Sequence, residues 1–100
     1  MLKKTAIIFL ILIFGIIPIT KAAWLLIPMD ESQKNHLKAY GIAYWILNKG
    51  GEVEWLLNYR GGSYLIKYHQ VFEEECVVRG VTSQVITDVQ ASSIKQQILQ

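Results

Sequence analysis

The chain has 100 residues, enough for one domain at most, and 52% of them are apolar. Its formal charge of +2 originates in the first 22 residues, because from Ala23 onward seven basic residues stand against eight acidic ones. The domain is nearly neutral and does not cluster Lys and Arg among aromatic residues, so its charge gives no reason to expect nucleic-acid binding.

The first 22 residues have the layout of a signal peptide. A short basic segment precedes an apolar run of twelve residues, Ala6–Ile17, and Thr20 and Ala22 supply small residues at a signal-peptidase site. A membrane anchor is the alternative, but a spanning helix needs about 20 apolar residues. We therefore predict a signal peptide at 1–22, a domain at 23–100, and export to the periplasm or the extracellular medium, with no membrane association after cleavage.

Short apolar runs bounded by Pro and Gly alternate with helical periodicity in the rest of the chain. The pattern predicts strands at Trp24–Ile27, Val53–Asn58 and Thr82–Thr87, and helices at about Ser32–Lys49, at about Tyr68–Arg79 and from Ala91 or Ser92 onward. Ser63–Lys67 is either an extended piece or the lead into the second helix. The strands begin 29 residues apart, as β-α units do. We predict an α/β fold with a Rossmann-like open parallel sheet and flanking helices, of which this chain holds the incomplete N-terminal part.

The helix at Ser32–Lys49 carries apolar residues at three- and four-residue steps, and these predict its buried face. The face comprises Leu37, Tyr40, Gly41, Tyr44 and Leu47, and it is widened by Ile42, Trp45 and Ile46. Either Asp30 or Ser32 is expected to cap the N-terminus. Gly41 costs about 1 kcal/mol relative to Ala in mid-helix, which predicts a close approach of the helix to the sheet.

Polar residues follow the predicted strands at the edge where open parallel sheets bind ligands. They are Asp30, Asn58, Arg60, Gly61, Gly62 and Asp88. The two glycines let a ligand approach the backbone, and the planar fork of Arg60 suits a carboxylate or phosphate. These loops predict a site for a small anionic ligand. The alternatives are that both Asp residues only cap helices and that Arg60 only forms a surface ion pair, for instance with Glu31.

No catalytic residue, metal ligand or cofactor can be assigned from the sequence. Cys76 lies late in a helix among three glutamates, a setting that favours a buried core residue over a thiol nucleophile. His36 and His69 lie on different predicted helices, without the spacing of metal ligands. Gly61-Gly62 matches neither the dinucleotide-binding pattern nor the P-loop pattern.

Three runs of the sequence, LIPMDESQKNHLKAYGIAYWILNKGGEVEWLLNYRGGSYLI, EEECVVRGV and VITDVQASSI, resemble exported bacterial proteins that carry the name asparagine synthetase B. The resemblance covers essentially the whole chain after the leader. Members of that family are several times longer, which implies that the protein continues beyond Gln100. A glutamine-dependent synthetase of the usual layout has an N-terminal catalytic cysteine and an SGG-x-DS loop. Here residue 2 is Leu and the loop does not occur, so no catalytic residue is carried over.

Two functional hypotheses follow from these observations. The first is an enzyme, amidotransferase-like or hydrolytic, whose catalytic residues lie beyond Gln100. In that case the partner of residues 23–100 is the remainder of their own chain. The second is a non-catalytic periplasmic module that binds a small ligand at the strand-end loops. A nucleophile on a strand-to-helix elbow in the longer chain would favour the enzyme.

Overall fold

The computed structural model describes residues 21–99. The predicted signal peptide falls almost entirely on residues 1–20, outside the described part, and its cleavage stays a prediction. The described chain contains four strands and three helices: β1 (Trp24–Ile27), α2 (His36–Asn48), β2 (Val53–Leu56), β3 (Ser63–Lys67), α3 (Gln70–Arg79), β4 (Gln84–Ile86) and α4 (Asp88–Leu99).

Side chains at the helix termini determine where α2 and α4 begin. The Asn35 side chain accepts a hydrogen bond of 3.0 Å from the Lys38 amide and caps α2, so the predicted caps at Asp30 or Ser32 are wrong. At α4 the Gln90 amide donates to Thr87 Oγ1 at 3.2 Å, and the Thr87 amide donates to Gln90 Oε1 at 2.9 Å. This reciprocal capping box starts α4 at Asp88, earlier than predicted.

All four strands form one antiparallel sheet in the order β2-β3-β1-β4. The central strand β1 pairs Leu25 with Ile66 of β3 on one side and with Val85 of β4 on the other. β1 and β2 run in the same direction with β3 between them, which is the connectivity of a split β-α-β, or ferredoxin-like, arrangement. The predicted Rossmann-like open parallel sheet is therefore wrong.

The turn that follows β2 explains this error. Arg60, Gly61 and Gly62 have φ angles of 45°, 81° and 92°, and the amides of Gly62 and Ser63 both donate to Tyr59 O at 3.0 Å. The turn reverses the chain at once, whereas a parallel neighbour requires a crossover of about a dozen residues or more. Ser63–Lys67 therefore returns along β2 as a strand, which the regular spacing of the other three strands concealed.

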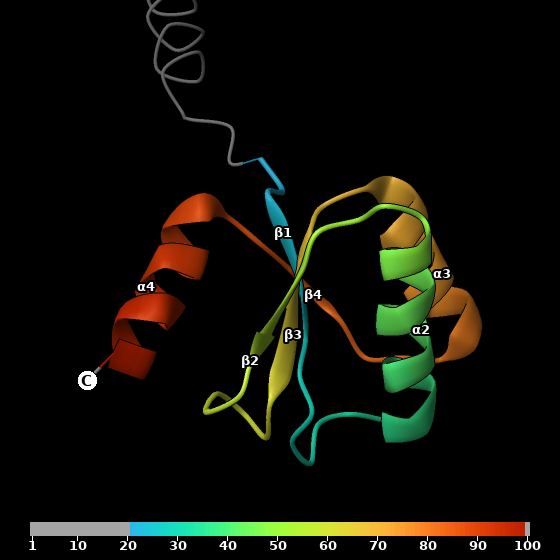
Figure 1. Ribbon diagram of the computed structural model, residues 1–100, viewed down its shortest axis with the longest axis horizontal. Coiled ribbons are helices and arrows are strands. Elements are labelled where there is room, and N and C mark those ends of the chain that lie inside the picture. The colour runs from blue at the N-terminus through green and yellow to red at the C-terminus, as the bar shows by residue number, and fades with distance from the viewer. Residues whose placement is uncertain (1–20, 100) are drawn as a thin grey trace, which may run out of the picture.

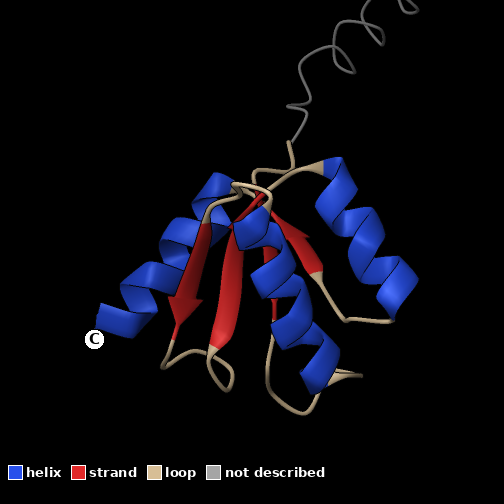
Figure 2. Ribbon diagram, turned by 45° about the vertical axis from the view of Figure 1, so that its right-hand side comes forward, coloured by secondary structure: helices blue, strands red, loops and turns tan. Residues whose placement is uncertain are grey.

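The sheet is covered on both faces. Figure 1 views it nearly edge-on, with α2 and α3 on one side and α4 on the other; Figure 2 turns its strands toward the viewer. Alternate side chains of a strand point to opposite faces, so Leu25 and Ile27 pack with α2 and α3 while Leu26 packs with α4. Each face of the sheet thus has its own apolar core.

The burial predicted for α2 is confirmed at Ile42 and Ile46 but is wrong on the outer surface of the helix. The sheet-facing residues are Ala39, Ile42, Ala43 and Ile46, whereas Leu37 is 81% exposed, Tyr44 is 67% exposed, and Tyr40 and Leu47 are also exposed. A Cβ at Gly41 would meet no atom within 4 Å, so the predicted close approach to the sheet is wrong. The helix has two apolar sides, and the sheet covers only one of them.

Replacing two glycines by Ala should change stability in opposite directions. A Cβ at Gly61 would lie 2.6 Å from the Met29 carbonyl oxygen, at a φ of 81° that disfavours L side chains, so we expect Gly61→Ala to lower the free energy of unfolding by about 1–3 kcal/mol. Gly41 is helical with open space around it, so Gly41→Ala should raise that free energy by about 0.5–1 kcal/mol. Urea unfolding followed by circular dichroism measures both, and equal effects of the two variants would contradict the described turn.

Candidate functional site

The loop after β1 and the turn after β2 are joined by one side chain, Arg60. Its Nε donates to Asp30 Oδ2 at 2.7 Å, its Nη2 to Ser32 Oγ at 2.9 Å and its Nη1 to Gln84 Oε1 at 3.1 Å. The guanidinium therefore connects three segments that meet at one end of the sheet. The carboxylate partner is Asp30, not Glu31 as the sequence alternative had it.

The ion pair changes the protonation of both partners. The hydrogen bond from Arg60, assisted by one from Ser32, lowers the pKa of Asp30 to about 2. The same bond to Asp30 raises the pKa of Arg60. Both side chains are partly exposed, so solvent screens the pair and its contribution to stability is modest.

The structure brings together five of the six predicted site residues. Asp30 and Arg60 are in contact, Gly61 packs against the Met29 backbone, and Asn58 and Gly62 belong to the same turn. Three of the five N–H groups of the guanidinium donate to Asp30, Ser32 and Gln84, so an anion at this place would share Arg60 with the Asp30 carboxylate and be repelled by it. Binding of a small anion here stays a prediction.

Asp88 lies at the opposite end of the sheet. β4 runs antiparallel to β1, so the carboxyl end of β4 adjoins the start of β1, where Asp88 Oδ1 accepts a hydrogen bond of 2.8 Å from Trp24 Nε1. The grouping of Asp88 with Asp30 assumed a parallel sheet. Because the sheet is antiparallel, Asp88 does not share the site of the other five residues.

Gln33 is a buried polar residue whose role the sequence did not reveal. Its Nε2 donates to Pro28 O at 2.8 Å and to Thr82 O at 3.0 Å, while its Oε1 accepts from the Thr82 amide at 2.8 Å. These bonds satisfy both ends of the amide side chain and attach the segment before β4 to the segment after β1. We assign Gln33 to the scaffold on this account.

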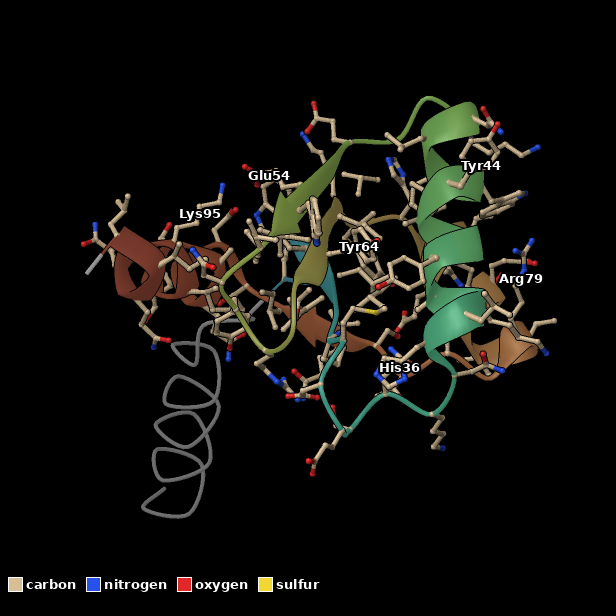
Figure 3. All side chains as sticks on the ribbon, turned by 60° about the horizontal axis from the view of Figure 1, so that its bottom comes forward. His36, Tyr44, Glu54, Tyr64, Arg79 and Lys95 are labelled. Carbon is tan, nitrogen blue, oxygen red and sulfur yellow. The ribbon has the colours of Figure 1, made fainter. Side chains whose placement is uncertain are left out.

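An apolar hollow in the surface lies between α2 and the edge strand β2. We call it the α2–β2 groove; it has a volume of about 460 Å³ and is lined by Tyr40, Ala43, Tyr44, Leu47, Val53, Trp55 and Tyr64. None of these side chains is charged. Tyr40 and Tyr64 meet edge to face with ring centroids 6.0 Å apart, and burial raises the pKa of Tyr64. Figure 3 shows Tyr64 projecting from the sheet toward α2.

Trp55 dominates the strand side of the α2–β2 groove. Its side chain is 62% exposed, yet its indole Nε1 donates to Gly62 O at 3.0 Å, which fixes the orientation of the ring. Trp55 lies in a run whose predicted structure is a buried parallel strand, so the sequence does not predict its exposure. The charged Glu54 next to Trp55 is atypical of a strand that is buried on both faces, and this pattern in the sequence indicates an exposed edge strand.

A second hollow, of about 390 Å³, lies beside Trp45 at the end of α2. The Lys49 ammonium and the Arg79 guanidinium lie 5.7 Å and 5.3 Å from the centre of the Trp45 ring. Trp45 thus has two cationic neighbours of its own.

Cys76 is fully buried, as predicted, and burial raises the pKa of its thiol to about 11, which keeps it protonated and unreactive.

No known family model, curated protein or solved structure matches the chain. The resemblance to the proteins named asparagine synthetase B stays a prediction from sequence motifs. Within residues 21–99, no three His, Cys, Asp or Glu side chains are grouped as metal ligands. No helix in that same range has the length and apolar character to cross a membrane.

The stability provided by Asp30 should depend on pH. The pKa of Asp30 is about 2 in the folded state, below its ordinary value of 3.8. The stability that the ionised Asp30 side chain provides is therefore complete at pH values above 3.8 and is lost as the pH falls through about 2. We expect Asp30→Asn to lower the urea midpoint at about pH 6, with the difference from wild type narrowing between about pH 4 and pH 2.

Glu31→Gln provides the matched control for this experiment, since Glu31 is the next residue and its side chain is exposed. Urea unfolding followed by circular dichroism should show a midpoint close to that of wild type at both pH values. A gap between wild type and Asp30→Asn that persists undiminished at about pH 2 would contradict the role of the Arg60 ion pair.

Proposed function

We propose that this domain is a non-catalytic binding module that holds an apolar segment of a partner protein in the α2–β2 groove. One observation carries the proposal: the exposed apolar side of α2 continues without a charged residue onto the exposed Trp55 of the edge strand. Two consecutive elements, α2 and β2, thus present one apolar surface. If the predicted signal peptide is cleaved, the module meets its partner outside the cytoplasm.

The size and composition of the groove support binding. Pockets of about 300–1,000 Å³ with mainly apolar and aromatic linings are typical of binding sites, and this groove has a volume of about 460 Å³. Trp and Tyr are enriched among the residues that dominate interface energies, and the groove contains Trp55 together with Tyr40, Tyr44 and Tyr64. Contiguous exposed apolar surface of this kind marks interaction sites on soluble proteins.

The rigidity of the lining supports the proposal as well. Trp55 is held by its hydrogen bond to Gly62 O, and Tyr64 is held by the sheet and by its edge-to-face contact with Tyr40. Side chains already fixed before binding lose little conformational entropy when a partner arrives. The groove is therefore preorganised on its strand side.

The enzyme hypothesis rests on the resemblance alone. It places catalysis beyond Gln100, and among the described residues the only thiol is the buried and protonated Cys76. The small-ligand hypothesis for Asp30 and Arg60 requires an anion to bind beside the Asp30 carboxylate, which lies 2.7 Å from Arg60 Nε. The α2–β2 groove presents no charge that opposes an apolar segment, so binding of such a segment is the function that the geometry favours.

Selection of displayed random peptides on the full chain tests the proposal. We expect enriched peptides to share apolar or aromatic residues, and Tyr44→Ser to weaken their binding about tenfold or more, as for an interface residue that dominates affinity. Tyr44 is 67% exposed, so the exchange leaves the core intact.

Val78→Ser is the matched control, because Val78 is 78% exposed on α3 and does not line the groove. Its affinity for the selected peptides should equal that of wild type. The absence of any enriched peptide, or equal binding by the Tyr44→Ser and Val78→Ser variants, would overturn the proposal.

A further inference from the structure

We infer that the partner segment is an extended strand of alternating apolar and basic residues that pairs antiparallel with the outer edge of β2. This inference rests on the proposed function and names the chemistry of the partner. It is carried by the backbone of β2, by the two faces of that strand and by the charges on each face.

The backbone of β2 offers two free residues at the sheet edge. Lys67 N donates to Glu52 O at 3.1 Å, which makes Glu52 and Lys67 a hydrogen-bonded pair of the antiparallel ladder. The register continues this alternation, so Glu54 is bonded to Leu65, whereas Val53 and Trp55 occupy the non-bonded positions. The amide and carbonyl groups of Val53 and Trp55 consequently point away from β3, and no described strand lies beyond β2.

The side chains of the same two residues line the α2–β2 groove. In an antiparallel pair, residues directly opposite each other have side chains on the same face of the sheet. A residue that exchanges backbone hydrogen bonds with Val53 or Trp55 would therefore place its own side chain at the uncharged groove. Every second residue of the added strand should accordingly be apolar.

The other face of β2 is acidic. Glu52 and Glu54 line a hollow of about 420 Å³ on the side of α4, together with Trp24, Val53 and Lys95. Glu54 Oε2 is bonded to Lys95 Nζ at 2.8 Å, and Figure 3 shows these two side chains facing each other. Glu52 is exposed and forms no ion pair within residues 21–99. The intervening residues of an added strand would lie beside these two carboxylates, of which Lys95 compensates one, so the remaining negative charge favours Lys or Arg.

The charges argue against a second copy of this chain as the occupant. Pairing β2 with the β2 of another copy would bring Glu52 and Glu54 beside the same acidic residues, and like charges on adjacent strands are destabilising. Natural edge strands are commonly protected by Lys, Pro or a bulge. Val53–Leu56 contains neither Lys nor Pro, and its one charged residue, Glu54, disfavours an acidic strand and favours a basic one.

A labelled synthetic peptide, acetyl-Thr-Val-Lys-Val-Lys-Val-Thr-amide, tests the inference by fluorescence anisotropy with the full chain. We expect saturable binding, and about tenfold or more weaker binding when both Lys are replaced by Glu. N-methylation of the Val residues should abolish binding, because their amides face β2. N-methylation of the Lys residues should be tolerated, because their amides face away from it.

Variants of the protein test the same bonds from the other side. Val53→Pro removes the outward amide at the first residue of an edge strand, where Pro is tolerated, and Val53→Ala keeps the amide with a smaller side chain. We expect the Pro variant to bind the peptide about fivefold or more weakly than the Ala variant does, as expected for one lost hydrogen bond. The N-methylated peptides decide the matter even if the Pro variant does not fold.

The outcomes separate this inference from the proposed function. Peptide binding that depends on Tyr44 but responds equally to both N-methylated peptides would overturn strand pairing and leave the groove as a binding site. Binding that is indifferent to Tyr44→Ser would overturn the proposed function. Self-association of the chain that blocks the peptide, measured by analytical ultracentrifugation, would make a second copy the occupant and overturn the inference.

Discussion

The left-handed turn at Tyr59–Gly62 is the constraint on which the rest of the architecture depends. Three consecutive residues with positive φ send the chain straight back along β2, so β3 is its antiparallel neighbour. The same turn places Arg60 against Asp30 and supplies the carbonyl of Gly62 that fixes the Trp55 indole. The pairing of β2 with β3, the loop network around Arg60 and the orientation of Trp55 in the groove therefore share one local cause.

Apart from β3, the sequence predicts the positions of the elements, but it does not predict the directions of the strands. The strand at Trp24–Ile27 has the predicted bounds, and the predicted helices overlap α2, α3 and α4. Parallel and antiparallel strands can carry the same short apolar runs, so only the turn distinguishes them. The Gly61-Gly62 pair predicts space for a ligand, whereas in the structure both residues serve the reversal of the chain. The predicted parallel sheet also groups Asp88 with residues that lie at the other end of the observed sheet.

The helix α2 shows a second limit of periodicity. Its apolar residues form two sides, one of Ala39, Ile42 and Ile46 and another of Tyr40, Tyr44 and Leu47. A pattern of spacing cannot indicate which side meets the sheet when both are apolar. The smaller alanines allow the helix to approach the sheet, and the tyrosines keep their hydroxyl groups in water. Residue size and polarity, more than spacing, decide the orientation.

The polar network and the aromatic groove differ in what remains unsatisfied. Asp30, Arg60 and Ser32 bond to one another, and Gln33 is bonded at both ends of its amide, so these groups have little to gain from a ligand. The groove, in contrast, contains groups without partners. Trp55 keeps most of its surface in water, and the outer side of the β2 backbone is not paired with any described strand. Apolar surface and unpaired edge groups both gain from a partner, the first by leaving water and the second by completing a ladder. Sequence motifs drew attention to the loops because charged and glycine residues are conspicuous there, but the unsatisfied chemistry of the molecule lies along β2.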